Sequence, residues 1–447
     1  MHPEKMTERR TALIGALLTT LGPISMSLYT PAMPALVHAF DTNDSTIKLT
    51  LSLYFGGFAF AQLVAGPLAD AFGRRIATML FLSIYLAGSL AAAFAPGIEW
   101  LLAGRLIQGI GASVGVTVSR AIVRDQFVGG EAARIMNLIG IMLAIGPAMA
   151  PTIGGLALAV FGWASIFFLM VGFGVAACLV VFFFLRETVV PDPRRASPGP
   201  LVKAYVELAG DARFVSAALV MAGAVGALYA QATMLPFILI EKVGLTPTQF
   251  GLSMIMQSGA YFFGSIALRL FTRRYGGSAA VKAGLVMIVT GSAMIVLSVP
   301  LLPPSFGSIM LPVAVYTFGI AFVSPQVTTS GMFPFPHIAG SASALMGFIQ
   351  MGSGFLGGIV AGADRQSAAG LRHRRAGAGH DRHPLLFLVP HRPPSRRSPG
   401  QRRGYVPRVA TRKPAEVSSG GFAFFGSVRG LLSPCGRGPP ACAAAAR

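Results

Sequence analysis

Arg105 is the residue with the clearest capacity for chemistry inside an apolar segment of this chain. It stands within the apolar run 98–120, and Gln108 follows one helical turn later on the same face. A charge inside a lipid bilayer costs at least about 2.5 kcal/mol, so such a residue faces a cavity or a partner. We expect Arg105 to bind a small molecule or to tune a proton-carrying group. The alternative is an arginine whose side chain reaches the membrane surface.

A second cluster of charged residues occupies the short connection GPLADAFGRR at 66–75. Glycines permit a tight turn, and an aspartate there can accept hydrogen bonds at a helix end or pair with an arginine. We expect a latch that breaks when neighbouring parts of the chain move, rather than a plain basic turn. Its expected members are Gly66, Asp70, Gly73, Arg74, Arg75 and, beside Arg124, Asp125.

Prolines and glycines recur in the segment GIMLAIGPAMAPTIGG at 140–155. Two prolines four residues apart remove backbone donors from one face of a helix and bend it. Glycines on the same segment let a neighbouring helix approach closely, although generic membrane-helix packing would use them in the same way. We expect conformational roles for Gly146, Pro147, Pro151, Gly154 and Gly155.

The elements that position these residues are long apolar segments. The 447 residues are 53% hydrophobic and 12% charged, against about 25% charged in a typical soluble domain. This composition excludes a cytosolic enzyme and a secreted disulfide scaffold, and it predicts an all-α polytopic membrane protein, because hydrocarbon offers a spanning backbone no hydrogen-bond partner. Eleven spans are predicted, at 11–36, 47–68, 76–95, 98–120, 135–159, 163–185, 213–240, 247–271, 279–302, 305–329 and 336–362.

The distribution of Lys and Arg predicts the orientation of these spans. The N-terminal segment and every second connection hold 3, 2, 3, 5 and 4 basic residues, a sum of 17. The connections on the opposite side hold only Lys48 and Lys242. The N-terminus is therefore predicted to be cytoplasmic.

The organisation predicted from the sequence has two halves. Residues 1–185 form a six-helix half, 186–212 a polar, Pro-rich cytoplasmic linker, and 213–363 a second half with five recognisable helices. A faint repeat relates the halves, since the arginine pair of 66–75 reappears in RLFTRRYGG at 269–277. Six helices, a linker and six related helices form a common transporter plan with the substrate site between the halves.

The tail at 364–447 breaks this plan. It holds 16 of the 36 Lys and Arg residues, so much of the net charge of +20 comes from the tail. Its composition favours a frame error near residue 364 that replaces a twelfth helix. A genuine disordered basic tail and a miscounted helix are the alternatives. The tail has no aromatics interleaved with its arginines, so we expect no nucleic-acid partner.

A substrate cavity is expected between the inner faces of the spans at mid-membrane. Aromatic and Met side chains offer adaptable apolar contacts there, and amides and hydroxyls add a few hydrogen bonds. For each residue alone, ordinary packing is the alternative. The expected lining is Tyr29, Tyr54, Gln62, Arg105, Gln108, Met142, Tyr229, Gln231 and Tyr261.

Together, the three motifs resemble those of the major facilitator superfamily, and the Gly-Pro segment resembles that of its drug:proton antiporters. Further stretches resemble the bicyclomycin and chloramphenicol resistance family. These are SMSLYTPAMP at 25–34, LTLSLY at 49–54 with Gln62, LPF at 235–237, GLTPTQFG at 244–251 and AGSASA at 339–344. The resemblance implies the major facilitator fold of two six-helix halves, here with helix twelve lost or replaced.

The resemblance also implies the function. It indicates a bacterial inner-membrane exporter of small amphipathic drugs that uses the proton gradient, needs no other cofactor, and works as a monomer in the lipid bilayer. Two departures stand out, because Ser27 occupies a position that is usually acidic in the family and Ala71 one that is usually basic. A metabolite transporter of the same fold and a non-functional truncated product are the alternatives. No metal-spaced His/Cys cluster and no phosphate-binding loop points to a metal site or an enzyme.

Overall fold

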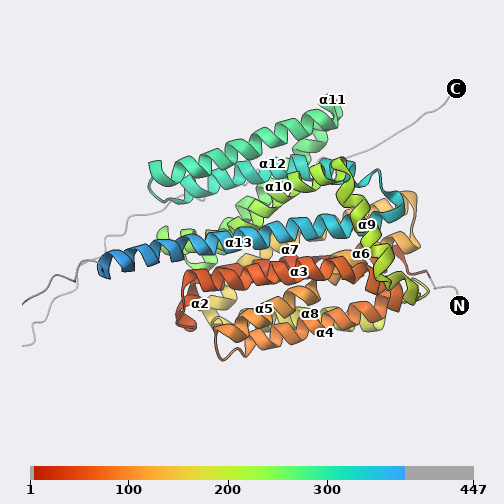
Figure 1. Ribbon diagram of the computed structural model, residues 1–447, viewed down its shortest axis with the longest axis horizontal. Helices are drawn as coiled ribbons and strands as arrows, with labels where there is room; N and C mark the ends of the chain where they lie inside the picture. The colour runs from red at the N-terminus through yellow and green to blue at the C-terminus, as the bar shows by residue number, and fades with distance from the viewer. Residues whose placement is uncertain (1–4, 378–447) are drawn as a thin grey trace, which may run out of the picture. The chain divides into compact units, whose positions relative to one another are not determined.

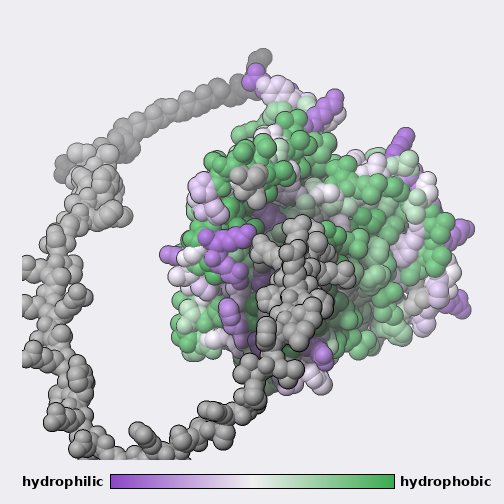
Figure 2. Space-filling model, turned by 60° about the vertical axis from the view of Figure 1, so that its left-hand side comes forward, coloured by the Kyte–Doolittle hydropathy of each residue, from purple (hydrophilic) through white to green (hydrophobic). Residues whose placement is uncertain are grey.

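Helices form all the regular secondary structure of residues 5–377, which are the residues that the computed structural model describes. Ten of these helices are long and apolar enough to cross a membrane. They lie side by side along the horizontal direction of Figure 1. Hydrophobic side chains cover most of the described surface in Figure 2, as expected for a surface that faces lipid. The predicted all-helical membrane fold is therefore confirmed.

The first half contains eight α-helices and one short 3-10 turn. Thr7 and Asn43 cap the first and third α-helices, each by accepting a backbone N–H with its side-chain oxygen. The elements are α1 Glu8–Tyr29, η1 Thr30–Ala32, α2 Met33–Ala39, α3 Asp44–Phe72, α4 Arg74–Ala93, α5 Ile98–Ala112, α6 Val114–Gln126, α7 Gly129–Phe161 and α8 Ala164–Phe184.

The expected linker contains a helix that the sequence did not predict, α9, and the second half follows it. Three helices that follow begin with a capping side chain or a capping box, at Asp211, Thr246 and Ser305. The elements are η2 Pro193–Ala196, α9 Pro198–Gly210, α10 Ala212–Pro236, η3 Phe237–Lys242, α11 Pro247–Leu301, α12 Phe306–Met332, η4 Pro336–Ile338 and α13 Ala339–Gly377.

The long element α11 contains two of the predicted spans, 247–271 and 279–302. Gly276 separates them with φ 81° and ψ 168°, a backbone conformation that glycine adopts without steric cost. Eleven predicted spans therefore correspond to ten candidate membrane helices. The connection between α3 and α4, the break within α11 and helix α9 lie at the same end of the helices, drawn on the right in Figure 1, and we call it the basic end.

Helices of the two halves meet along two seams. In the first, α3 packs against α13 over much of its length, and in the second α7 packs against α11. Within the first half, glycines allow backbones to touch: a Cβ at Gly109 of α5 would collide with the carbonyl oxygen of Tyr54 on α3. Each half has its own buried apolar cluster, one around Tyr29 and Phe58 and one around Phe214 and Ile320.

Helix α9 contacts both halves. The hydroxyl of Tyr205 donates to the carbonyl of Leu63 on α3 at 2.7 Å, and burial raises the pKa of Tyr205 to about 12. On its other side, Glu207 pairs with His337 in η4 at 3.0 Å. The predicted linker is thus partly a packed helix.

The last described helix passes the predicted end of the second half. α13 continues to Gly377, beyond residue 363, where the sequence changes character. Residues 378–447, which make up most of the predicted tail, lie outside the described part of the chain. The reading-frame interpretation therefore stays a prediction.

Candidate functional site

Arg105 is completely buried inside the first half. It projects from α5, and its guanidinium lies between the rings of Tyr29 on α1 and Tyr54 on α3. The guanidinium carbon is 4.3 Å from the centroid of the Tyr29 ring and 4.4 Å from that of Tyr54. Both distances are those of cation–π contacts, which are strongest where water is excluded. Three helices therefore hold one cation between two aromatic faces.

The hydrogen bonds of Arg105 leave one edge of its guanidinium open. Nη1 donates to Oε1 of Gln108, whose Nε2 in turn donates to Ser89 Oγ at 2.7 Å and lies 3.2 Å from Met170 Sδ. Nε and Nη2 are buried and have no hydrogen-bond partner among the described residues. These two nitrogens share one edge of the planar group, and such an edge can donate two parallel hydrogen bonds to a carboxylate or phosphate.

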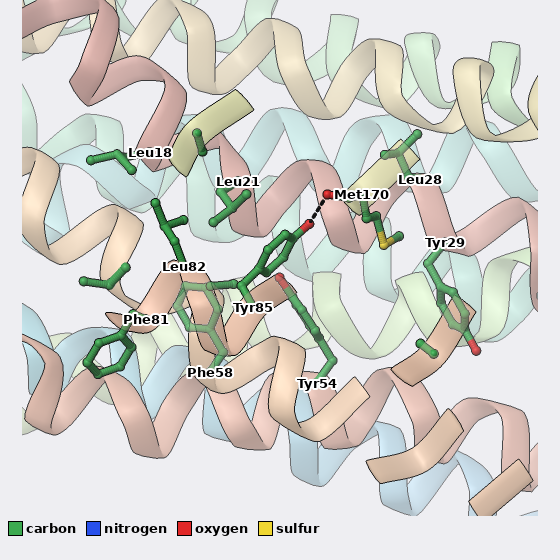
Figure 3. Close-up of a cluster of buried hydrophobic side chains, with 14 of the residues drawn as sticks. Leu18, Leu21, Leu28, Tyr29, Tyr54, Phe58, Phe81, Leu82, Tyr85 and Met170 are labelled. Carbon is green, nitrogen blue, oxygen red and sulfur yellow. Dashed lines mark hydrogen bonds between the residues drawn. The ribbon is translucent and has the colours of Figure 1, made fainter. Parts of the chain in front are cut away.

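The tyrosines around Arg105 are fixed by hydrogen bonds to neighbouring helices. Tyr29 shares a hydrogen bond with Thr50 at 2.5 Å, and Tyr54 donates to the carbonyl of Gly22 at 2.9 Å. Tyr85 contacts Ser25 at 2.6 Å and donates to the carbonyl of Met170 at 3.4 Å, the bond drawn in Figure 3. The hydroxyls are therefore held in place before any ligand arrives.

Three of these side chains were not predicted from the sequence. Tyr85, Ser89 and Met170 complete the surroundings of Gln108 and of the tyrosine cluster. Tyr85 and Ser89 stand four residues apart in the predicted span 76–95, so two polar residues on one helix face were the available signal. Met170 carried no such signal.

The structure brings together only part of the predicted cavity lining. Tyr29, Tyr54, Arg105 and Gln108 form one cluster. Gln62 lies on the seam, where a Cβ at Gly347 would overlap its amide. Tyr229 packs against the apolar clusters of both halves, and its ring is tilted against that of Phe55 at 5.0 Å between centroids. Tyr261 packs in the second-half cluster, Gln231 is half-buried and Met142 is 47% exposed on α7.

The charged cluster at the basic end is centred on Arg74, the first residue of α4. Its guanidinium pairs with Asp70 one turn before it and with Asp125 of α6, where Nε lies 3.0 Å from Oδ2. The side chain of Arg74 is 3% exposed, so this cation is buried between two carboxylates. Gly73 (φ 96°) makes the turn before it, and Arg75 donates to the carbonyl of Phe182.

Glu187, just after α8, caps the same helix. Its carboxylate accepts the backbone N–H of Arg74 at 2.7 Å and of Arg75 at 3.1 Å, at the positive end of the α4 dipole. Thr188 donates its hydroxyl to Asp125 at 3.0 Å. These contacts join α3, α4 and α6 of the first half to the start of the linker, just after α8. Sequence reasoning missed Glu187 and Thr188, although the acid stands in the RET segment of the expected linker.

The glycines of α7 make the close approaches that their spacing indicates. A Cβ at Gly154 would collide with the carbonyl of Leu28 on α1, and one at Gly155 with that of Pro247 on α11. Gly146 faces Ile24, with Cδ1 3.0 Å from the place of a Cβ. Pro147 and Pro151 lie inside the helix, and Gly66 leaves room for Thr117 of α6. The Gly-Pro segment of α7 therefore packs against α1 on one side and against α11 of the second half on the other.

Known bacterial proteins resemble most of this chain. An uncharacterized MFS-type transporter, YdgK, of Bacillus subtilis is 31% identical over 356 residues, which are 78% of this chain and 87% of that protein. A bicyclomycin resistance protein homolog of Haemophilus influenzae is 25% identical over 371 residues, 83% of this chain and 93% of its own.

The fold also resembles solved transporter structures. A bacterial homolog of the human lysosomal transporter Spinster, in an inward-facing and unoccupied conformation, superposes with a TM-score of 0.65 at 19% identity and covers 83% of this chain and 85% of its own. The family pattern of the Major Facilitator Superfamily matches residues 15–358. With its two helical halves, its motif at the basic end and its buried arginine, the chain belongs to the major facilitator superfamily.

Proposed function

We propose that this transporter exports small amphipathic drugs from the bacterial cytoplasm, across the inner membrane, in exchange for protons. Its two halves alternate access to a site that includes Arg105, and the basic end faces the cytoplasm, as the excess of Lys and Arg there indicates. The relation to a bicyclomycin resistance protein homolog supports drugs as the cargo. A monomer suffices, since both halves belong to one chain.

The observation that carries the proposal is the environment of Arg105. A buried cation with one open edge is expensive to keep unless the reaction cycle uses it. Tyr29 and Tyr54 offer apolar ring surface beside that edge, and Gln108 offers an amide. An amphipathic drug needs this combination of aromatic surface and a few hydrogen-bonding groups.

Proton coupling is proposed without a carboxylate in the middle of a span. Asp70 and Asp125, the nearest acidic candidates, are paired with Arg74, which favours a structural role for them. A titratable group of the drug itself would then carry the proton, because an arginine keeps its own proton in proteins.

Drug accumulation in bacterial cells that lack their own drug exporters tests the proposal. Cells that express the full chain are loaded with a chloramphenicol-class drug, with and without a protonophore, while membrane yield is measured. We expect low accumulation that rises with protonophore, and loss of that difference in Arg105→Ala. Equal accumulation with and without the chain, at good membrane yield and across several amphipathic drugs, would reject drug export.

One observation favours a second candidate, export or uptake of a small organic anion. The open Nε and Nη2 edge of Arg105 suits a carboxylate, and no acidic residue lies in the middle of any span to occupy it. Uptake of labelled benzoate into vesicles that contain the protein separates the two candidates. Saturable benzoate movement without drug export would favour the anion.

A further inference from the structure

The second half contains a groove at the basic end that the proposed transport cycle does not use. It has a volume of about 360 Å³ and lies between α11 and α12. We call it the basic groove, because two arginines four residues apart line it from one face of α11. Its lining residues are Ser265, Leu268, Arg269, Thr272 and Arg273 of α11 and Gln326 of α12.

The positive charge of the basic groove has no internal counter-charge. Residues 242–363 contain no Asp and no Glu, and neither Arg269 nor Arg273 is paired with a carboxylate among the described residues. Like charges four residues apart on a helix repel each other. An anion from outside the chain would relieve this repulsion.

The equivalent place in the first half shows what is missing. Gly73 and Gly276 occupy corresponding places in the two repeated basic segments, 66–75 and 269–277. Both have positive φ, 96° and 81°. Three residues before them stand Asp70 and Arg273, so an acid in one half is replaced by a base in the other. The first half supplies its own anions to Arg74, whereas the second half supplies none.

The partner helix shows the same exchange. Arg74, the residue after Gly73, pairs with Asp125 of α6, while Gly277, the residue after Gly276, faces Gln326 of α12. A Cβ at Gly277 would lie 2.9 Å from Oε1 of that glutamine. An ion pair in the first half therefore corresponds in the second to a glycine packed against a neutral amide, where neither residue carries a charge.

A hydroxyl in the basic groove also lacks a partner. Oγ1 of Thr272 is buried and has no hydrogen-bond partner among the described residues, and it stands between the two arginines in sequence. One hydroxyl, one amide and two guanidinium groups are all donors. A group with several charged acceptor oxygens satisfies them together, and phosphate esters have that chemistry.

We propose that the basic groove binds a phosphate-ester anion through Arg269, Arg273 and Thr272. The groove lies on the last turns of α11 before the break at Gly276, and phospholipid headgroups are expected near such helix ends, so an anionic headgroup and a free phosphate ester are the two sources of this chemistry. The proposal depends on the membrane fold and not on which cargo the protein moves.

Lipid retention by the purified full chain tests the proposal. The protein in maltoside detergent is mixed with phosphatidylglycerol, or with diacylglycerol of the same acyl chains, and bound lipid is counted by native mass spectrometry. We expect retention of phosphatidylglycerol only. Replacing both Arg269→Ala and Arg273→Ala should weaken retention at least about tenfold, because two charge-assisted contacts are lost.

Arg274→Ala is the matched control. Arg274 follows Arg273 directly, but its guanidinium lies over the ring of Tyr275 and does not line the basic groove. This variant should retain lipid as the unmodified protein does. Thr272→Val, which keeps the side-chain shape, should weaken retention without changing the unfolding temperature in detergent alone, so it remains informative if the double variant misfolds.

Competition with glycerol 3-phosphate identifies the source of the ligand. Displacement of phosphatidylglycerol, with an increase in unfolding temperature from glycerol 3-phosphate alone, indicates a site for free phosphate esters. Retention that glycerol 3-phosphate does not affect indicates a headgroup site. Equal retention by the unmodified protein, the double variant and Thr272→Val would overturn the proposal, as would an equal loss in Arg274→Ala.

Discussion

At the scale of single residues, the surroundings of Arg105 explain how a buried cation is tolerated. Each tyrosine face stabilises the cation by up to about 2 kcal/mol where water is excluded. Gln108 also accepts a hydrogen bond from Nη1 of Arg105. Both tyrosine hydroxyls are engaged elsewhere, with Thr50 and Gly22, so the rings cannot turn away. The cation is held mainly by ring faces, which leaves its hydrogen-bonding edge free.

Replacing Arg105 therefore tests the site more sharply than replacing any of its neighbours. Arg105→Ala should abolish transport and leave membrane expression intact, since it removes a charge that burial disfavours. Arg105→Lys should recover less than about a tenth of the activity, because an ammonium lacks the planar two-donor edge. Drug accumulation with and without protonophore is the measurement.

Arg134→Ala is the control for that experiment. Arg134 is 68% exposed and pairs with Glu8 on the surface, so its loss should not alter transport. Normal energised export by Arg105→Ala would show that this residue is only part of the packing.

The sequence predicts the site along each helix better than between helices. Arg105 and Gln108 were predicted because their spacing puts them on one face of one helix. Met170 comes from α8 and was not predicted, since nothing in the spacing of one segment tells which helix lies opposite. That Tyr229 and Tyr261 line the cavity stays a prediction: Tyr229 packs against the apolar clusters of both halves, and Tyr261 packs against that of the second half.

At the scale of elements, Arg74 connects three helices of the first half. Arg74→Gln should lower the free energy of unfolding by about 3 kcal/mol, because Asp70 and Asp125 are left without their cation. The midpoint of thermal unfolding in detergent measures this effect. Arg124→Gln, one residue before Asp125 and exposed, should change stability by less than about 0.5 kcal/mol. Equal effects of the two would contradict a buried ion cluster.

Helix packing in the first half depends on glycines where backbones touch. Gly109→Ala should destabilise the protein by about 1–3 kcal/mol, because the added methyl group collides with the carbonyl of Tyr54. Gly172→Ala on α8 is the control, since nothing lies within 4 Å of the place of its Cβ. It should be neutral or stabilising, as alanine favours helix by up to about 1 kcal/mol. Unfolding temperatures in detergent compare the two variants.

The spans were predictable, whereas the helix inside the linker was not. Apolar length alone marks a membrane helix, which is why the helical membrane fold was predicted from the sequence. α9 was missed because its first turn contains Pro198 and Pro200, which are typical of linkers yet tolerated at a helix start. The break in α11 lies at Gly276, and the sequence placed a connection there.

At the scale of the whole described chain, the first of the two seams between the halves joins α3 and α13. Ser45 donates its hydroxyl to the carbonyl of Gly362 at 2.7 Å, at the end opposite the basic end. Farther along, Phe60 and Phe348 meet edge to face at 5.3 Å, and Arg120 of α6 donates to Ser343 at 2.9 Å. Alternating access requires at least one of these contacts to open.

A disulfide across this seam should stop transport. The Cβ of Ser45 lies 3.8 Å from the place of a Cβ at Gly362, and disulfides have a Cβ separation of about 3.8 Å. In a variant without Cys178, Cys435 and Cys442, Ser45→Cys with Gly362→Cys should cross-link on oxidation and lose export. Reduction with dithiothreitol should restore it.

Each single cysteine variant serves as a control for the cross-link. Both should export normally before and after oxidation. Full export by the cross-linked protein would show that α3 and α13 stay together at this end throughout the cycle.

Helix α9 also sets a limit to how far the halves can separate at the basic end. Tyr205 anchors it to α3 and Glu207 to His337, only two residues further along the same helix. Because the two contacts are so close together on one rigid helix, either one of them breaks in each cycle or the movement of the halves at this end stays small. While both anchors hold, the connection that the sequence presents as a linker limits how wide this end can open.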